Sequence, residues 1–148
     1  MCENRKARHD YFLEDFYEAG ISLTGTEVKS LREGRANLRD SYCEFRGNGV
    51  YLVNMHISPY SKASFRDNHE PLRPRRLLLH KYEILKLANR VREKGYTLIP
   101  VTIYFNERGY AKAEIALAKG KRQYDKRDDM LERDAKRRID RALKERYR

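Results

Sequence analysis

The sequence predicts an α+β protein that is mostly β-structure, built as a small antiparallel barrel with flanking helices and a basic C-terminal tail. Three observations indicate this class. Two pairs of alternating apolar and polar runs, at 41–57 and 96–118, are each joined by a short turn that contains glycine. A third, aromatic-rich run lies near the N-terminus. Two further segments space their apolar residues as helices do.

The composition favours a single domain that binds a polyanion. The 148 residues carry 33 lysines and arginines against 22 aspartates and glutamates, a net charge of +11. Nucleic acid is the first candidate partner of so basic a chain, and a role in solubility alone is the alternative. Residues 119–148 hold 13 basic and 7 acidic side chains, so this last fifth carries more than half of the excess charge.

The sequence shows no sign of an oxidising compartment or of a membrane. Cys2 and Cys43 provide no disulfide framework. No apolar run approaches the roughly 18–20 residues that cross a bilayer, and the N-terminus lacks the apolar core of a signal peptide. We therefore expect a cytoplasmic protein with no membrane partner.

The first strand is expected over 9–23, where aromatic residues are frequent. A regular strand would place two alternating sets of side chains on opposite faces. The sets are Tyr11, Leu13, Asp15 and Tyr17 on one face, and Phe12, Glu14 and Phe16 on the other. Gly20 is expected to break or bulge the strand.

Two helices are predicted. The segment 25–34 has Thr26 as its expected N-cap and Gly34 just past its C-terminus. The stronger signal lies in 77–95, where apolar residues recur three and four positions apart and Gly95 ends the helix. Its apolar positions are Ile84, Leu87, Ala88 and Val91.

Two hairpins and one long loop complete the body. The hairpins turn at 47–49 and at 106–109. The last strand puts Lys112 and Glu114 on one face, with alanine, isoleucine and leucine on the other. Residues 58–76 contain three prolines and no periodicity, so we expect a loop there.

The residues after the last strand, 119–148, are expected to form a tail that is disordered alone and helical on a partner. Leu131, Ile139 and Leu143 make only a thin apolar stripe at helical spacing. Acid–base pairs four residues apart add about 0.2–0.5 kcal/mol each. These small terms do not hold a helix without further contacts.

No catalytic motif is present in the sequence. The four histidines and two cysteines lack metal-ligand spacing, and there is no phosphate loop, nucleophile elbow or zinc-protease pattern. The acidic residues Asp10, Glu14, Asp15 and Glu18 leave a Mg²⁺-dependent nuclease as the enzyme alternative. Carboxylates at i, i+4 and i+8 of a strand span roughly 26 Å, too far to share one metal. We therefore expect a solvated charged face, no enzyme activity and no cofactor.

Two polar residues of the body have two interpretations each. His80 precedes the second helix, so it is either an N-terminal capping or partly buried histidine or a contact with RNA beside Arg75 and Arg76. Lys112 is either an ordinary outward lysine of a half-buried strand or an RNA contact.

Several segments, in order along nearly the whole chain, resemble the SmpB (small protein B) family, which binds transfer-messenger RNA (tmRNA). The segments are NRKARHDYF, YEAGISLTGTEVKSLREGRANLRDSY, NMHISPY, RPRRLLLHKYEI and ALAKGKRQYDKRDDMLERDAKR. The blocks GTEVKSLR, LLLHK and AKGK with DKR are highly specific in combination.

The resemblance implies a closed, OB-like barrel over 1–118 and a tail over 119–148 with a non-catalytic role in trans-translation. In that process tmRNA charged with alanine enters a ribosome stalled on a message that lacks a usable stop codon, and the unfinished chain receives a degradation tag. The tail would occupy the decoding centre and the empty message channel of the small subunit. Elongation factor Tu and alanyl-tRNA synthetase would be met through tmRNA, and the protein would act as a monomer.

The resemblance also assigns roles by position. Glu18, Leu78 and His80 match family residues needed for tmRNA binding, and Lys112 aligns with a fourth. Tyr124 falls where the family carries a residue able to stack on ribosomal RNA. The segment expected to act on the ribosome comprises Lys119, Gly120, Lys121, Arg122, Tyr124, Asp125, Lys126 and Arg127, with Ile139 and Leu143 farther along.

With the resemblance set aside, a structural ribosomal RNA-binding protein with a basic tail is the alternative. Stoichiometry separates the two: a structural protein stays with washed ribosomes at one copy each, and a rescue factor does not.

Overall fold

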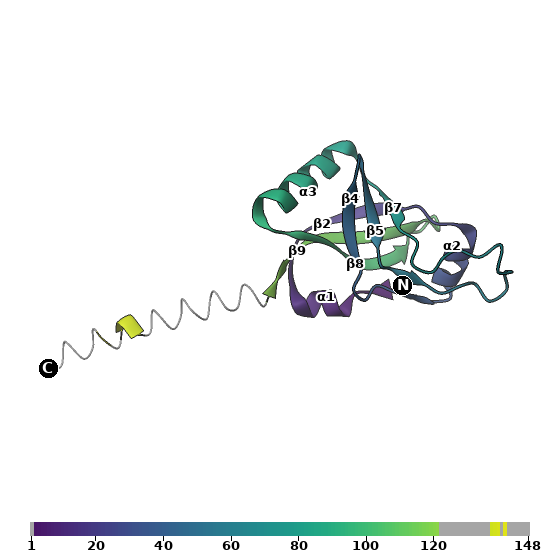
Figure 1. Cartoon of the computed structure of the whole chain (residues 1–148), viewed down its shortest axis with the longest axis horizontal. Coiled ribbons are helices and arrows are strands. Elements are labelled where there is room, and N and C mark those ends of the chain that lie inside the picture. The colour runs from purple at the N-terminus through teal and green to yellow at the C-terminus, as the bar shows by residue number, and fades with distance from the viewer. Residues whose placement is uncertain (1, 122–136, 140, 142–148) are drawn as a thin grey trace.

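The computed structural model describes residues 2–121, 137–139 and 141, and over these residues the chain is mostly β with a few helices (Figure 1). The prediction of a mostly β chain is confirmed. In order, the elements are β1 (Cys2–Glu3), α1 (Arg5–Asp10), β2 (Tyr11–Ile21), α2 (Gly25–Arg32), β3 (Ala36–Asn37), β4 (Tyr42–Arg46), β5 (Gly49–Val53), β6 (His56–Ile57), β7 (Arg75–Leu78), α3 (Lys81–Lys94), β8 (Thr97–Phe105) and β9 (Ala111–Gly120).

The strand pairs are all antiparallel and make one large sheet and one small one. In the large sheet the neighbours run β1-β8-β4-β5-β7-β2-β9, and β8 pairs with β9 as well. Starting at β8, each strand pairs with the next in the order β4, β5, β7, β2 and β9, and β9 pairs with β8 again. The small sheet consists of β3 and β6.

The main core gathers apolar side chains from α2, α3 and the long strands. Each such Leu or Ile contributes about 1.5–3 kcal/mol relative to an exposed position. Its fully buried members include Leu31, Leu52, Leu77, Leu87, Ile103 and Ile115. A smaller cluster of Ala7, Ile99 and Ala118 lies beside α1. The two clusters take opposite faces of β9, which is why that strand is buried on both sides at 115–118.

A bulge in β2 exchanges the two faces of this strand. Glu14 lies opposite Leu117 of β9, yet the next aligned residue, Tyr17, lies opposite Ile115. Two residues of β2 therefore stand against one of β9, and the first of them, Asp15, has a positive φ of 50°.

The single face expected for four alternating residues of this strand is consequently wrong. Tyr11 and Leu13, before the bulge, pack on the cluster beside α1, whereas Tyr17, after it, packs on the main core. The bulge was expected at Gly20, which instead lies in regular pairing with both neighbouring strands.

The N-terminal residues form a short helix that the sequence analysis did not predict. The Asn4 side chain accepts a hydrogen bond from the Ala7 backbone N–H at 3.2 Å and donates one to the Pro100 carbonyl at 2.9 Å. Asn4 thereby caps α1 and ties it to β8, and the strand expected from residue 9 begins only at Tyr11.

The two predicted helices are confirmed with one change of cap. Thr24, not Thr26, is the N-cap of α2, because its hydroxyl accepts from the Glu27 N–H at 3.4 Å while the Glu27 carboxylate accepts from the Thr24 N–H at 2.9 Å. The C-terminus of α3 is as predicted: Gly95 takes the left-handed conformation with φ of 67°.

Both predicted hairpins are present, β4–β5 and β8–β9. The first one ends earlier than its alternating pattern, because Asn54 has a positive φ of 64° and β6 pairs with β3. The loop expected over 58–76 ends sooner too, since Arg75 and Arg76 begin β7, which pairs with β5 and β2.

β9 continues two residues past its expected end at Ala118. Lys119 and Gly120 lie opposite Phe12 and Tyr11 of β2. The expectations for Arg122, Tyr124, Asp125, Lys126, Arg127 and Leu143 lie outside the described residues. Within the described part of the chain, no helix has both the length and the apolar character that crossing a bilayer requires.

Candidate nucleic-acid interface

Three residues assigned by the resemblance lie on one outer face of the large sheet. Gly20 of β2 is opposite Lys112 of β9 on one side and Leu78 of β7 on the other. Residues directly opposite in antiparallel pairs project from the same face. Lys112 and Leu78 therefore flank Gly20, and Glu18, two residues back along β2, shares this face. We call Glu18, Leu78 and Lys112 the outer row.

Gly20 gives Leu78 its place in the outer row. A Cβ atom at position 20 would lie 3.2 Å from the Leu78 Cβ and 3.3 Å from its Cδ1, closer than most side chains allow. With glycine there, the Leu78 side chain extends over β2 and stays 57% exposed. The row thus offers an apolar contact with a cation and a carboxylate nearby.

Glu18 is held in place by a tyrosine two strands away. The Tyr104 hydroxyl of β8 donates a hydrogen bond to the Glu18 carboxylate, across the intervening β9. Burial and this hydrogen bond raise the pKa of Tyr104 to about 12. The phenol therefore stays protonated near neutral pH and remains a donor to Glu18. The carboxylate keeps further lone pairs for hydroxyl or amino groups of a partner.

His80 stands two residues beyond Leu78, at the N-cap of α3, and its side chain is exposed. Its backbone N–H donates to the Glu83 carboxylate at 3.1 Å. The imidazole lies against the Tyr82 ring, with centroids 5.5 Å apart and planes 8° from parallel. His80 is therefore the N-cap residue of α3 but is exposed and forms no side-chain cap bond, and its contact with RNA stays a prediction.

A shallow hollow of about 250 Å³ joins Arg76 to these residues. Arg76 is exposed and lies on the same face of β7 as Leu78. The hollow is lined by Gly49, Arg76, Leu77, Leu78, Leu79, His80 and Ile84. The structure therefore brings Arg76, Leu78 and His80 together at the junction of β7 and α3.

Arg75 is not part of this surface, which corrects its assignment as an RNA contact. Its side chain is fully buried and forms an ion pair with the buried carboxylate of Glu27. The guanidinium also donates to the Met55 carbonyl and, at 3.1 Å, to the Pro71 carbonyl. Alternation along β7 turns Arg75 inward when Arg76 points outward, so only one of the two arginines can meet RNA.

The Glu27–Arg75 pair is an internal structural element. Burial by itself raises the pKa of Glu27, but hydrogen bonds from Arg73 and Thr24 and the charge of Arg75 lower it below its ordinary value. Burial lowers the pKa of Arg75, and Glu27 opposes that shift. The two charges therefore depend on each other, and α2 is joined through them to β7.

The first residues assigned to the tail lie against the body. The Lys119 ammonium is 4.9 Å from the centroid of the Tyr96 ring, and the Lys121 ammonium is 5.4 Å from that of Phe12. Lys121 also donates to the Arg8 carbonyl at 3.4 Å. Gly120 is in β9. Lys119, Gly120 and Lys121 are thus held against the body, and Ile139, farther on, is 58% exposed.

The acidic residues near the N-terminus are engaged by other side chains, and Arg90 lies within ion-pair distance of two of them, Glu14 and Asp15. Glu14 accepts from the Tyr96 hydroxyl at 3.0 Å, and Asp15 pairs with Arg90 at 3.5 Å. Asp10 lies 3.0 Å from the His9 ring nitrogen, and Glu18 is bound to Tyr104. Among the described residues, no group of three or more such ligands could hold a metal ion. The nuclease alternative has no support from this arrangement.

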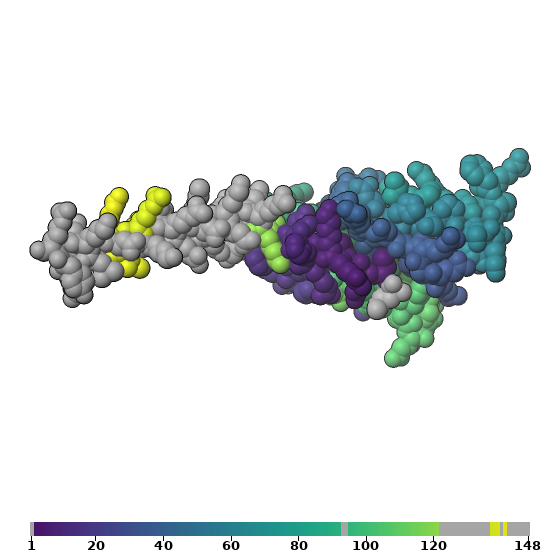
Figure 2. Space-filling view, turned by 90° about the horizontal axis from the view of Figure 1, so that it is seen from below, coloured from purple at the N-terminus to yellow at the C-terminus, as the bar shows by residue number. Residues whose placement is uncertain are grey.

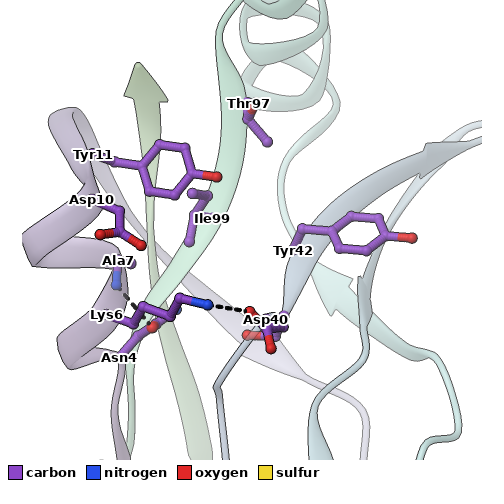
Figure 3. Close-up of a pocket in the computed structure, with 10 residues that line it drawn as sticks. Asn4, Lys6, Ala7, Asp10, Tyr11, Asp40, Tyr42, Thr97 and Ile99 are labelled. Atoms are coloured by element: carbon purple, nitrogen blue, oxygen red, sulfur yellow. Dashed lines mark hydrogen bonds and ion pairs between the residues drawn. The ribbon is translucent and has the colours of Figure 1, made fainter. Parts of the chain in front are cut away.

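A larger cavity of about 310 Å³ lies beside α1, apart from the outer row (Figure 3). The Lys6 ammonium and the Asp40 carboxylate meet across it at 2.9 Å, and this contact lowers the pKa of Asp40. Its lining is Asn4, Lys6, Ala7, Asp10, Tyr11, Asp40, Ser41, Tyr42, Thr97 and Ile99. None of the residues that the sequence assigned to RNA binding takes part in it.

Two aromatic residues of the candidate interface were missed from the sequence, Tyr82 and Tyr104. Tyr104 alternates with the buried Ile103 in β8, which was a signal that it faces outward. Tyr82 lies beside His80 in the first turn of α3. With both included, the surface offers rings, a cation, an apolar side chain and an oriented carboxylate, a combination that suits stacking and phosphate contacts on folded RNA.

Comparisons with known proteins point to one family. The family model described as "SmpB protein" matches residues 1–145. A relative named SsrA-binding protein, from Moorella thermoacetica, is 64% identical over 146 residues, which cover 99% of this chain and 94% of the relative. Relatives of the same name from Symbiobacterium thermophilum and Clostridium botulinum are 60% and 58% identical, covering 99% and 100% of this chain and 92% and 94% of theirs.

A solved structure, described as "tmRNA-SmpB: a journey to the center of the bacterial ribosome", contains a similar chain. The TM-score is 0.67 and the sequence identity 53%, and the match covers 80% of this chain and 82% of that chain.

Proposed function

The chain belongs to the SmpB protein family, and on that premise we propose that it binds tmRNA, also called SsrA RNA, and delivers it to stalled ribosomes in trans-translation. The observation that carries the proposal is the outer row. Glu18, Leu78 and Lys112, which are far apart in the sequence, lie together on one exposed face next to His80. They are the positions that the family resemblance assigns to tmRNA binding.

The scaffold is a closed, OB-like barrel in this proposal. Support comes from the pairing of β8 with both β4 and β9, which returns the sequence of strand pairs to its start. A barrel of this kind presents its outer strands and the adjoining helix end as a rigid surface. Recognition of one folded RNA then requires little ordering of the protein.

Each residue of the surface has a separate task. The Lys112 ammonium neutralises one phosphate. The Arg76 guanidinium donates two parallel hydrogen bonds to a second phosphate. Leu78 packs against a ribose or the face of a base. Glu18, oriented by Tyr104, accepts from a 2′-hydroxyl or a base amino group. The exposed His80 ring, backed by Tyr82, completes the surface with a stacking contact.

The tail performs the ribosomal part of the task. Lys119 and Lys121, packed against Tyr96 and Phe12, hold its first residues against the body. The basic residues beyond them would neutralise the phosphates of the decoding centre and the message channel. A factor that acts on the ribosome would act in the cytoplasm.

The direct test measures affinity for the tRNA-like part of tmRNA as salt is varied. Roughly 6–10 phosphate contacts would lower the affinity ~10³–10⁵-fold between 50 and 200 mM salt. Lys112→Ala should weaken binding and reduce the slope of log K against log salt by about 1. Lys6→Ala is the control, because Lys6 is on α1 and is paired with Asp40. If Lys112→Ala and Lys6→Ala show equal slopes of log K against log salt, Lys112 does not contact RNA. Absence of tmRNA binding by the wild type would refute the proposed function.

A further inference from the structure

Phe65 is the most exposed large apolar side chain among the described residues, at 98%. It lies in the loop 58–74, between β6 and β7, and not in the outer row. This loop projects beyond α2, at the opposite end of the molecule from the last residues of β9, and forms that end of the surface (Figures 1 and 2). An exposed phenylalanine on a projecting loop is an unused stacking surface.

The base of the loop is fixed to the body by buried and half-buried groups. The His69 ring nitrogens meet the Thr26 hydroxyl at 2.8 Å and the Ile57 carbonyl at 2.9 Å. The Ile57 N–H donates to the Pro71 carbonyl at 3.0 Å, and Arg75 donates to the same carbonyl. The loop is therefore a positioned structure, in which the tip keeps its direction relative to α2 and β7.

The tip itself is a capped turn. The Asn68 side chain accepts from the Tyr60 N–H at 2.8 Å and donates to the Tyr60 carbonyl at 2.9 Å, which closes the segment 60–68. Inside it, the Asp67 N–H donates to the Ser64 carbonyl at 3.1 Å, and the Ser64 hydroxyl donates to the Asp67 carboxylate at 2.8 Å. Phe65 follows Ser64 in this turn, so the turn holds the ring out in solvent.

Two cations lie close to Phe65 in the sequence of the tip. Lys62 and Arg66 are exposed within the tip. The Lys29 ammonium of α2 lies 5.5 Å from the centroid of the Tyr60 ring, and the Ser58 N–H donates to the Arg35 carbonyl, so the basic C-terminal end of α2 adjoins the loop. Two exposed carboxylates, Asp67 and Glu70, accompany these cations, and Asp67 is engaged by Ser64. The two cations of the tip are balanced by these two carboxylates, and Lys29 of α2, beside Tyr60, adds one further positive charge.

We propose that Phe65, with Lys62 and Arg66, is a second RNA contact, separate from the outer row, in which the ring stacks on an unpaired base and the two cations bind flanking phosphates. An aromatic ring between cations is the combination by which proteins hold unpaired nucleotides without reading their sequence. A buried apolar pocket on a protein partner would accept the ring but would reject the adjacent charges. The inference rests on the proposed function for the identity of the RNA, which is either tmRNA or ribosomal RNA.

The test begins with Phe65→Ala and separates the two RNA sources. Affinity is measured for the tRNA-like part of tmRNA and, independently, for purified small ribosomal subunits. Loss of one stacked base should weaken binding about 5- to 150-fold in one of these arms. Phe16→Ala is the matched control, since Phe16 is 51% exposed on the β2 bulge, away from the loop. Because Phe65 touches solvent almost everywhere, the thermal unfolding of Phe65→Ala should equal that of the wild type.

Two further variants distinguish stacking from apolar insertion. Phe65→Leu should bind as weakly as Phe65→Ala, because leucine has no π-face, whereas Phe65→Trp should retain binding. The chain has no tryptophan of its own, so Phe65→Trp also places the sole indole at the tip. Its fluorescence should become quenched and protected from acrylamide in the same arm where Phe65→Ala fails.

The inference is overturned if Phe65→Ala binds both RNA targets as the wild type does, or if Phe65→Leu keeps full affinity, which would indicate a protein pocket. It is equally overturned if the indole of Phe65→Trp stays accessible to acrylamide in both complexes. These outcomes differ from failure of the proposed function, in which the wild type itself binds neither target.

Discussion

The Tyr104 hydroxyl donates a hydrogen bond to the Glu18 carboxylate across the whole width of β9. This contact ties the orientation of a residue assigned to tmRNA binding to a residue that no family motif marked. The acidic side chain is therefore positioned before RNA arrives, and its orientation costs little when the complex forms.

Tyr104→Phe should accordingly weaken tmRNA binding with little effect on folding. A hydrogen bond to a charged group contributes about 1.5–3 kcal/mol when buried, and less at this half-exposed site, so we expect roughly a 3- to 30-fold loss of affinity. Tyr110→Phe is the control, since Tyr110 is 65% exposed in the β8–β9 turn. If Tyr104→Phe binds tmRNA as tightly as the wild type, Glu18 needs no orientation by Tyr104.

Gly20 leads to a second prediction, in which a small change displaces Leu78. Gly20→Val should push the Leu78 side chain out of the outer row, because even a Cβ would lie 3.2 Å from that of Leu78. Overpacking costs about 1–3 kcal/mol, and we expect about a tenfold or larger loss of tmRNA affinity. Gly25→Ala is the matched control, since a Cβ there meets no atom within 4 Å. Wild-type affinity in Gly20→Val would show that the position of Leu78 is unimportant.

Arg75 and Arg76 are neighbours with opposite expected phenotypes. Arg75→Ala leaves the Glu27 charge buried without its closest partner and should reduce the free energy of unfolding by ~3–5 kcal/mol. Arg76→Ala should change stability by less than ~0.5 kcal/mol and weaken tmRNA binding. Chemical denaturation and filter binding of both variants provide the comparison. The reverse pattern would mean that Arg75, not Arg76, faces RNA.

Stability should fall in acid partly through Glu27. Its folded-state pKa is lower than its unfolded value of about 4.3, so its contribution is complete above that value and is lost as pH falls through the folded pKa. Thermal unfolding between pH 3 and 7 should therefore show a smaller loss in Glu27→Gln, which starts less stable, than in the wild type. The exposed Glu33→Gln serves as control. Parallel curves for Glu27→Gln and the wild type would exclude this linkage.

Truncation should separate the body from the tail, provided that the cut respects β9. A chain ending at Lys121 keeps the strand pairs of Lys119 with Phe12 and of Gly120 with Tyr11, so its stability should be retained. Its tmRNA affinity should stay within about tenfold of the wild type, whereas tagging on stalled ribosomes should be lost. A chain ending at Ala118 loses those pairs and should unfold at a lower temperature. Loss of tmRNA binding by the Lys121 truncation would refute this division of tasks.

Local patterns predicted the elements that depend on neighbouring residues. The apolar spacing of α3 and its terminal Gly95, and the alternation in the β8–β9 hairpin, are properties of short segments. The bulge in β2 is not such a property. Tyr11, Leu13 and Tyr17 alternate as in a regular strand, and only the pairing with β9 shows that the strand changes face between them. The six-residue α1 was missed because so short a helix depends on the link from Asn4 to β8.

Local sequence patterns likewise predicted only part of the candidate site. Alternation showed that Lys112 points away from the core, yet no local pattern could show that it lies opposite Gly20, because register is a long-range property. The resemblance supplied the names of Glu18 and Leu78, and the pairing of β2 with β7 and β9 supplied their proximity. Arg75 was misassigned because an arginine is rarely fully buried, and its buried partner Glu27 is distant in the sequence.

The pairing of β2 with β9 has a consequence for the order of events during synthesis. β2 is synthesised early but can pair with β9 only after β9 has been synthesised. About 90 residues separate Ile21 from Ala111, which corresponds to roughly 5–20 s at ordinary translation speeds. Until β9 emerges, the edge of β2 is open to pairing with other chains, a hazard for aggregation. The same pairing also sets when the candidate RNA surface is complete. Glu18 and Lys112 come to share one face only after β9 has been translated and has paired with β2, so a prematurely ended copy of this protein lacks the surface with which it would engage RNA.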